Sequence, residues 1–326
     1  MKKTNKNKCK LYLIAILCTI LWGSAIPLIK LGYDFFNIEA NATADKLLFA
    51  GIRFLGAGLI ILIPYFISRK EITFTKKLCA NSLVLGIIQT AGQYFFMYIG
   101  LAYTTGVNAS VFKAFGTLLY IILAWIIFRD EKISVAKVIG CTVGFSGILL
   151  NCLATQKMGT LSFLGDGFIM ISNFCVAVGF LYSKRSVKDS NPFLLTGIQM
   201  GIGGLVLLVI GLLWGGTLPK VSISGVVLLL YLMIVSSVAF SLWTLLLKEY
   251  PSALVGIFNF LTPVFGTVFS YILSKFGLLN ESSAFTTYTV LAIICSALGI
   301  FLSSLDQLKK YEEQKTLFKN NQVIRS

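Results

Sequence analysis

The sequence contains no histidine and is poor in acidic residues, with 13 Asp and Glu against 28 Lys and Arg. Without histidine, zinc or iron sites with imidazole ligands and His-based catalytic triads are excluded. The seven cysteines form neither a Cys-x-x-Cys pattern nor a disulfide framework. No paired carboxylates, nucleophile elbow or phosphate-binding loop is found. We therefore expect no enzyme activity, no metal site and no cofactor.

Charge of either sign is also scarce, at 13% of residues, whereas 56% are hydrophobic and the mean hydropathy is +0.84. A soluble domain carries about twice that share of charge. Apolar runs of about 20 residues recur, and that length crosses a ~30 Å hydrocarbon core. These runs predict an all-α integral membrane protein with ten transmembrane helices, at 11–30, 47–67, 79–101, 107–128, 134–153, 161–182, 193–214, 222–247, 252–274 and 284–304. The basic start resembles a signal peptide, but its apolar run continues to Lys30 without a cleavage site of small residues, so we count it as a span.

The net charge of +15 raises the alternative of a nucleic-acid partner, and the position of the basic residues decides against it. With the N-terminus placed in the cytoplasm, 21 basic residues fall in cytoplasmic segments and five in outer segments. Such asymmetry sets the orientation of membrane proteins. We predict a multi-pass protein of the cell membrane with both termini cytoplasmic, in contact with the lipid bilayer and not with nucleic acid.

Three short matches occur in the same order in both halves of the chain. They pair 51–59 with 197–205, 115–117 with 265–267, and 147–151 with 299–303, at offsets of 146, 150 and 152 residues. Because each half would hold five spans, an odd number, the second copy must be inverted relative to the first. We predict two inverted five-helix repeats, 1–153 and 154–305, followed by a cytoplasmic tail at 306–326. Inverted repeats commonly enclose a substrate site near the middle of the bilayer.

Two basic side chains, Arg53 and Lys113, fall inside predicted spans. Each such charge costs roughly 2.5–3.5 kcal/mol on insertion scales. Both lie six positions into a span that runs inward, so each sits about 9 Å below the outer boundary. One interpretation is that they line a polar cavity and attract a carboxylate or phosphate. The other is that each snorkels to the headgroups or pairs with a backbone carbonyl.

The fourth span carries a stripe of small or polar residues around Lys113, and the ninth span repeats it with Pro263 at the equivalent position. The stripes are Gly106, Ser110, Lys113, Thr117, Tyr120 and Ala124, and Gly256, Asn259, Pro263, Gly266, Ser270 and Ser274. Small residues also let helices pack closely, which is the alternative. We favour a cavity because Lys113 interrupts such a packing seam. Since proline removes an amide and weakens its helix, we expect Pro263, Gly116 and Gly266 at hinge or gate positions.

Neutral hydrogen-bonding residues inside spans are suited to zwitterionic ligands, although each can instead bond between helices. They are Gln89, Gln93, Asn173, Gln199, Ser236, Ser237 and Ser241. No Asp or Glu lies near the middle of a span, and Asp166 lies near the outer end of the sixth, where we expect a helix N-cap. Carboxylate-driven proton exchange with cationic drugs is therefore disfavoured.

Several local motifs resemble the EamA-type branch of the drug/metabolite transporter superfamily. They are Trp22-Gly23-Ser24, Arg53-Phe54, Asn108-Ala109-Ser110 leading to Asp130-Glu131, Leu164-Gly165-Asp166 and Pro263-Val264-Phe265. The resemblance covers essentially the whole chain. It implies two inverted bundles around a central cavity, cytoplasmic termini, and export or exchange of small metabolites. The chain departs from the pattern at Lys113, where the fourth span of the family is usually neutral or proline.

From these observations we predict an alternating-access carrier, monomeric or homodimeric, for a small anionic or zwitterionic metabolite such as an amino acid. The expected substrate contacts are Lys113, Arg53, Gln89, Gln93, Ser110, Thr117, Asn173, Gln199 and Asn259. The alternative is a lipid-headgroup-binding scramblase or a non-transporting accessory protein with the same fold. A membrane enzyme ranks third, because no catalytic set is present.

Overall fold

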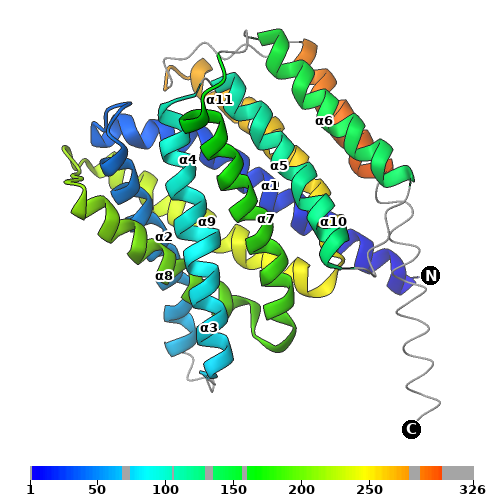
Figure 1. Cartoon of the computed structure of the whole chain (residues 1–326), viewed down its shortest axis with the longest axis horizontal. Helices are drawn as coiled ribbons and strands as arrows, with labels where there is room; N and C mark the ends of the chain where they lie inside the picture. The colour runs from blue at the N-terminus through cyan, green and yellow to red at the C-terminus, as the bar shows by residue number, and fades with distance from the viewer. Residues whose placement is uncertain are drawn as a thin grey trace.

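A computed structural model describes residues 2–67, 74–104, 106–128, 135–155, 160–278 and 287–302, and within these ranges the chain is helical without a β-strand (Figure 1). The helices are α1 (Lys2–Phe36), α2 (Thr43–Ile67), α3 (Lys76–Leu85), α4 (Gln93–Ala102), α5 (Gly106–Ile127), α6 (Val135–Thr155), α7 (Phe168–Ser186), α8 (Pro192–Leu213), α9 (Ile223–Glu249), α10 (Ser252–Gly256), α11 (Leu261–Lys275) and the unlabelled Thr287–Leu302. Four short helical segments complete them: η1 (Gly86–Gly92), η2 (Phe163–Gly167), η3 (Val187–Asp189) and η4 (Ile257–Phe260). The end of the bundle where α1 begins is called the N-side below, and the end where α1 finishes is the distal side.

Among the described residues, seven helices are long and apolar enough to cross a membrane. They are Cys9–Phe36, Thr43–Ile67, Lys76–Ala102, Phe163–Asp189, Pro192–Leu213, Ile223–Glu249 and Ser252–Lys275. Shorter apolar helices lie at Val111–Ile127, Val135–Leu150 and Thr287–Leu302. Every segment predicted from hydropathy coincides with one of these helices, which confirms a multi-pass, all-helical membrane protein.

Two of the long helices change their winding near the middle. In Lys76–Ala102, the seven residues of η1 form a π-helix between α3 and α4. In Ser252–Lys275, the 3₁₀ turn η4 ends shortly before Pro263, whose ring crowds the carbonyl four residues earlier and whose nitrogen cannot donate. Such interruptions leave backbone groups outside the regular hydrogen-bond ladder and are frequent at functional sites.

Helices α2 and α8 run antiparallel and touch through glycines. A Cβ atom placed on Gly51 would lie 2.4 Å from the backbone nitrogen of Leu208, and one on Gly197 would lie 2.9 Å from the side chain of Leu62. These two contacts are exchanged when 146 is added to the first-half residue number, since Gly51 maps to Gly197 and Leu62 maps to Leu208. The same offset relates the sequence matches of the two halves.

A second reciprocal pair of contacts joins α1 to α11 and α5 to α7. A Cβ on Gly23 would lie 2.5 Å from Cβ of Phe265, and one on Gly116 would lie 2.5 Å from Cγ of Asn173. Adding 150 maps Gly23 to Asn173, whereas Phe265 is the counterpart of residue 115, the neighbour of Gly116. The absence of side-chain atoms at Gly23 and Gly116 lets these helices approach closely.

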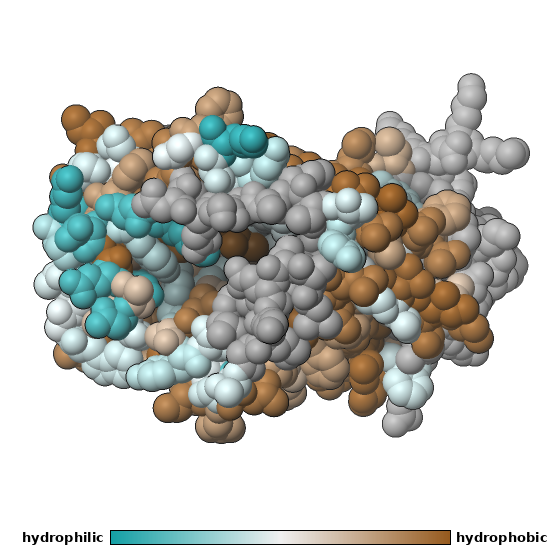
Figure 2. All heavy atoms as spheres, turned by 90° about the horizontal axis from the view of Figure 1, so that it is seen from above, coloured by the Kyte–Doolittle hydropathy of each residue, from teal (hydrophilic) through white to brown (hydrophobic). Residues whose placement is uncertain are grey.

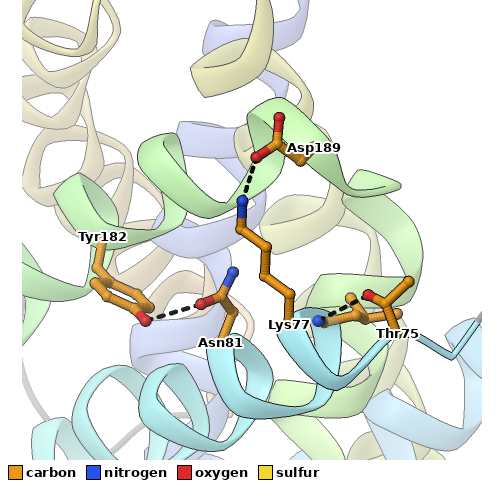
Figure 3. Close-up of polar contacts among 6 residues, drawn as sticks. Thr75, Lys77, Asn81, Tyr182 and Asp189 are labelled. Atoms are coloured by element: carbon orange, nitrogen blue, oxygen red, sulfur yellow. Dashed lines mark hydrogen bonds and ion pairs between the residues drawn. The ribbon is translucent and has the colours of Figure 1, made fainter.

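Polar contacts tie α3 to the end of α7 on the N-side (Figure 3). The Thr75 hydroxyl caps α3 by accepting from the backbone of Leu78, while Lys77 pairs with Asp189 of η3. Tyr182 of α7 donates to Asn81 of α3 at 2.9 Å. These contacts lie at the ends of the helices, where exposed ion pairs add little stability.

The glycine contact between α2 and α8 gives a direct test of the packing. A Cβ on Gly204 would lie 2.2 Å from the backbone nitrogen of Leu55, whereas a Cβ on Gly201 meets nothing within 4 Å. We expect Gly204→Ala to force the helices apart and to destabilise the protein by about 1–3 kcal/mol, the usual cost of overpacking. Gly201→Ala is the matched control and should melt close to the wild type. Equal melting temperatures for the two variants in detergent would contradict this packing.

Candidate functional site

Arg53 is buried in the middle of the bundle, with 2% of its surface exposed. Its Nε donates to Oγ of Ser236 on α9 at 2.9 Å, and its guanidinium lies 5.0 Å from the ring centre of Phe54. Its Nη1 is buried and has no hydrogen-bond partner among the described residues. A buried guanidinium with unused donors favours binding of an anion, because an unpaired charge in a low-dielectric interior is costly.

Three tyrosines, Tyr33 of α1 and Tyr94 and Tyr98 of α4, lie within electrostatic reach of Arg53. The Tyr94 ring packs 4.3 Å from that of Phe54 and 6.1 Å from that of Tyr98, centre to centre. The hydroxyls of Tyr33 and Tyr98 are buried and interact with each other. Arg53 therefore lies among phenolic side chains of α1 and α4, whose O–H groups are potential donors.

Lys113 of α5 lies against the same part of α4, with Nζ 3.4 Å from Sδ of Met97. Its side chain is exposed, although it lies within a helix that packs against α7 and α4. Neither Lys113 nor Arg53 forms an ion pair with a described carboxylate.

The three predicted glutamines are all buried, and each has an unpaired Oε1 within the described part of the chain. Gln93 begins α4, next to the tyrosines, and Gln89 lies in the π-helical segment η1. Gln89 packs against Gly179 of α7. A Cβ atom placed on Gly179 would lie 2.6 Å from the Cβ of Gln89. Gln199 of α8 occupies the position that the offset of 146 relates to Arg53.

The predicted substrate contact Asn173 already has a partner within the protein. Its Nδ2 donates to the Phe112 carbonyl at 2.7 Å and so joins α7 to α5. Thr117 is buried one turn after Lys113 on α5. Asn259 is half-buried in η4. The side chain of Ser110 lies outside the described part of the chain.

The predicted hinge positions lie at close contacts or at a change in winding. Pro263 follows η4, and its carbonyl accepts from the Thr267 hydroxyl at 3.1 Å. Gly116 faces Asn173 across the contact between α5 and α7, and Gly266 lies beside Gly23 at the contact between α11 and α1. The structure thus places Gly116 and Gly266 at close helix contacts and Pro263 just after a change in winding, and their role as hinges stays a prediction.

An aromatic layer closes the bundle on the N-side of the two cations. It consists of Trp22, Phe180, Phe240 and Trp243, with ring centres 4.9 Å apart for Trp22 and Trp243 and 5.7 Å apart for Phe180 and Trp243. Along α9, Phe240 and Trp243 follow Ser236, the partner of Arg53, toward the N-side. We call these four residues, together with Tyr120, the aromatic layer.

Tyr120, the α5 member of this layer, joins α5 to the start of α10. Its ring lies 5.8 Å from that of Phe180, and its hydroxyl donates to the Ser252 carbonyl at 3.0 Å. A Cβ on Gly256 would lie 2.1 Å from Cε1 of Tyr120, so only glycine fits there. The face seen from above, in contrast, is hollowed near its middle, with hydrophobic residues at the floor and hydrophilic residues gathered to one side (Figure 2).

Asp166 is a buried carboxylate near the distal side, and its role differs from the predicted N-cap. The N-cap is Ser162, whose hydroxyl accepts from the backbone of Gly165, while Asp166 accepts from the Ser162 amide at 2.7 Å. The second Asp166 oxygen accepts from the Thr104 hydroxyl, and the amide of Asn108 lies 3.5 Å from the first. Asp166 therefore joins the start of α7 to the connection between α4 and α5.

Sequence reasoning missed the tyrosines and the aromatic layer. The spacing of Tyr94 and Tyr98, one helical turn apart and directly after Gln93, was the available signal that they share a face. No such signal exists for the aromatic layer, because its rings come from α1, α5, α7 and α9.

Comparison with known proteins gives matches over most of the chain. The profile of the EamA-like transporter family matches twice, at residues 10–153 and 163–305. Uncharacterized transporter YyaM of Bacillus subtilis is 28% identical over 271 residues, covering 80% of this chain and 85% of its own. An uncharacterized transporter of Archaeoglobus fulgidus is 27% identical over 312 residues, covering 91% and 98%. One crystal structure with 16% identity superposes with a TM-score of 0.73, covering 92% of this chain and 98% of that one.

The buried carboxylate Asp166 should matter more for stability than the exposed carboxylate of Asp189. Asp166→Asn removes the charge that strengthens its hydrogen bonds with Thr104 and Ser162, and we expect a loss of about 1–3 kcal/mol. Asp189→Asn, the matched control, removes an exposed ion pair with Lys77 and should barely change the melting temperature. Thermal unfolding of the purified variants measures both, and a larger effect at Asp189 would contradict the arrangement.

Proposed function

Since the chain belongs to the EamA-like transporter family, we propose that it carries a small anionic or zwitterionic metabolite across the cell membrane by alternating access. Its relatives bear the name of transporter, and the chain is a membrane transporter rather than an enzyme. The family membership confirms the resemblance drawn from the sequence motifs. The substrate class and the transport mechanism are the parts proposed here.

The proposed architecture is ten transmembrane helices in two inverted repeats, 1–153 and 154–305, with a tail at 306–326. Three observations support it. One family profile matches both halves. The contacts between α2 and α8 are exchanged by the repeat offset, and those joining α1 to α11 and α5 to α7 are related by it to within one residue. A two-fold axis between inverted copies would produce this reciprocity.

We assign the N-side to the cytoplasm. Among the described residues, its helix ends carry more basic side chains than the distal ends. Those on the N-side are Lys10, Lys76, Lys77, Lys137, Lys184, Arg185, Lys188 and Lys248, and those on the distal side are Lys30, Lys46, Lys220 and Lys275. An excess of Lys and Arg is typical of cytoplasmic segments.

The aromatic layer is proposed as the closed inner gate of an outward-open carrier. Its residues Trp22, Tyr120 and Phe180 correspond, at the offset of 150, to Ser172, Ser270 and Lys30 on the opposite side. Large aromatic rings therefore lie on the N-side of the bundle, whereas small or polar residues stand at the equivalent places on the distal side. This asymmetry fits the hollow on the upper face (Figure 2). Pro263, Gly116 and Gly266 are the proposed hinge positions.

The observation that carries the proposal is the pair of cations, Arg53 and Lys113, which lie inside the bundle without a described acidic partner. Intramembrane ionisable residues mark substrate or ion pathways by default, because they are costly elsewhere. The unpaired amide oxygens of Gln89, Gln93 and Gln199 add neutral acceptors. A small polar solute with at least one negative group would satisfy these groups.

Thermal stabilisation of the purified protein tests this function. Amino acids, organic acids, phosphorylated metabolites and lipid headgroups are compared on wild type, Lys113→Ala and the control Lys275→Ala, whose lysine lies at the distal end of α11. A ligand at 100 times its dissociation constant stabilises by about 2.7 kcal/mol. We expect a soluble anionic or zwitterionic ligand whose effect is lost in Lys113→Ala and kept in Lys275→Ala. Stabilisation by headgroups alone would support the scramblase alternative and refute the carrier.

The inner gate can be tested at Gly256. Because a Cβ there would collide with the Tyr120 ring, Gly256→Ala should hold the gate open. Cys18, which is fully buried one turn from Trp22 toward the N-side, then becomes accessible. We expect a water-soluble maleimide to modify Cys18 faster in Gly256→Ala than in wild type, as measured by peptide mass spectrometry. Gly201→Ala is the control, since a Cβ there meets nothing within 4 Å and Gly201 lies outside the aromatic layer and the proposed hinges. An unchanged rate at Cys18 would refute the gate.

A further inference from the structure

Arg53 and Lys113 approach one segment of α4 from two different helices. Arg53 of α2 lies near Tyr94 and Tyr98, and Lys113 of α5 reaches Met97, so both cations lie within about one turn of the same helix. Neither cation is paired with a described carboxylate. A ligand with a single negative group would neutralise one of them and leave the other unpaired. The geometry therefore calls for two negative groups.

Among the described residues, no carboxylate is available near the two cations to pair with them or with a ligand ammonium. Asp166 is the only carboxylate buried in the described part of the chain, and its oxygens already accept from Ser162, Thr104 and Asn108. It has no free oxygen aimed at a ligand ammonium in this arrangement. The acceptors that remain unpaired are neutral glutamine oxygens, which bind a hydroxyl or amide as readily as an ammonium.

We infer that the substrate is a dianion with two negative groups, carboxylate or phosphate, one held by Arg53 and the other by Lys113. This inference rests on the proposed carrier function and narrows its substrate class. Arg53 is suited to orient one group, because its planar donors include the unpaired Nη1 and the Tyr33 and Tyr98 hydroxyls stand nearby. Lys113 is suited to the other as a flexible point charge on an accessible stem.

Arg53 and Lys113 also differ in how deeply they are buried, which predicts different effects of substituting each of them. Arg53 is held by Ser236 and packed on Phe54, so its position is fixed before a ligand arrives. The soft sulfur of Met97 is the one hydrogen-bond partner of the Lys113 Nζ among the described residues, so this Nζ can move to meet ligands of different length. A series of dianions should therefore bind with a broad optimum of length, set by the reach of Lys113.

Four-carbon ligands of matched size separate the charge classes. Succinate carries two negative groups, butyrate carries one, and γ-aminobutyrate is a zwitterion of the same length. We expect succinate, or another member of the series from malonate to adipate, to stabilise the wild type at concentrations at which butyrate and γ-aminobutyrate do not. Glycerol phosphate and inorganic phosphate are included, because they distinguish a phosphate from a carboxylate as the preferred group.

Variants at Lys113 assign the second negative group. Lys113→Met keeps the length and removes the charge, and it should weaken binding of the best dianion by about tenfold to a hundredfold, the worth of one charged hydrogen bond. The affinity for the matched monoanion should stay the same, which shows that the variant is folded. Lys113→Arg restores the charge and should recover most of the dianion binding. Arg53→Lys should reduce binding of both classes, since each needs the Arg53 group.

The outcomes separate this inference from the function on which it rests. A dianion preference that Lys113→Met abolishes supports both. Better stabilisation by γ-aminobutyrate or other zwitterions, or a dianion preference that survives in Lys113→Met, overturns the two-cation site and leaves the carrier in place. If no soluble ligand stabilises the protein and only lipid headgroups do, both the dianion site and the carrier are refuted.

Discussion

The cost of placing a charged group among membrane-spanning helices determines how this molecule is organised. Arg53 stays in its place only because Ser236 accepts from it, Phe54 packs under it and three tyrosines surround it. Those partners come from α1, α2, α4 and α9, so the helices must assemble before the charge is tolerated. Even then Nη1 is left over. The site is thus not added to a finished fold, because its charge requires the fold that surrounds it and still lacks one partner.

Close backbone contact supplies the rest of the architecture. Without a hydrophobic driving force between helices in lipid, association depends on packing, and glycines allow it where α2 meets α8 and where α1 meets α11. The reciprocity of these contacts means that one packing solution is used twice. At Gly256 the same device serves a different purpose, because it makes room for the Tyr120 ring in the aromatic layer. Substituting a glycine can therefore alter either stability or gating, depending on its partner.

The hydrophobic segments could be predicted well, since a run of about 20 apolar residues has few alternatives to a spanning helix. Arg53 and Lys113 could be singled out from the sequence because a charged side chain inside a spanning helix costs free energy. The tyrosines beside Arg53 and the rings of the aromatic layer could not, because an aromatic side chain in a span is equally suited to face lipid or the interior. Asp166 illustrates a local limit: its nearness to a helix start predicted a cap, but the helical segment begins at Phe163, which makes Ser162 the N-cap. What remained hidden from the sequence is which faces meet across helices distant in the chain.

The two cations also bear on how the proposed carrier avoids cycling empty. The Lys113 side chain is exposed, so water can hydrate its charge in the proposed outward-open state. Closing the distal side without a ligand would strip that water from Lys113 while Arg53 still lacks a partner for Nη1, and desolvation of unpaired charge opposes the step. A bound anion replaces the lost water with ionic contacts, and a dianion does so for both cations at once. The loaded carrier can then close, whereas the empty one is held open by its own charges. A site built from unpaired cations therefore favours exchange of one anion for another over net movement of the empty protein.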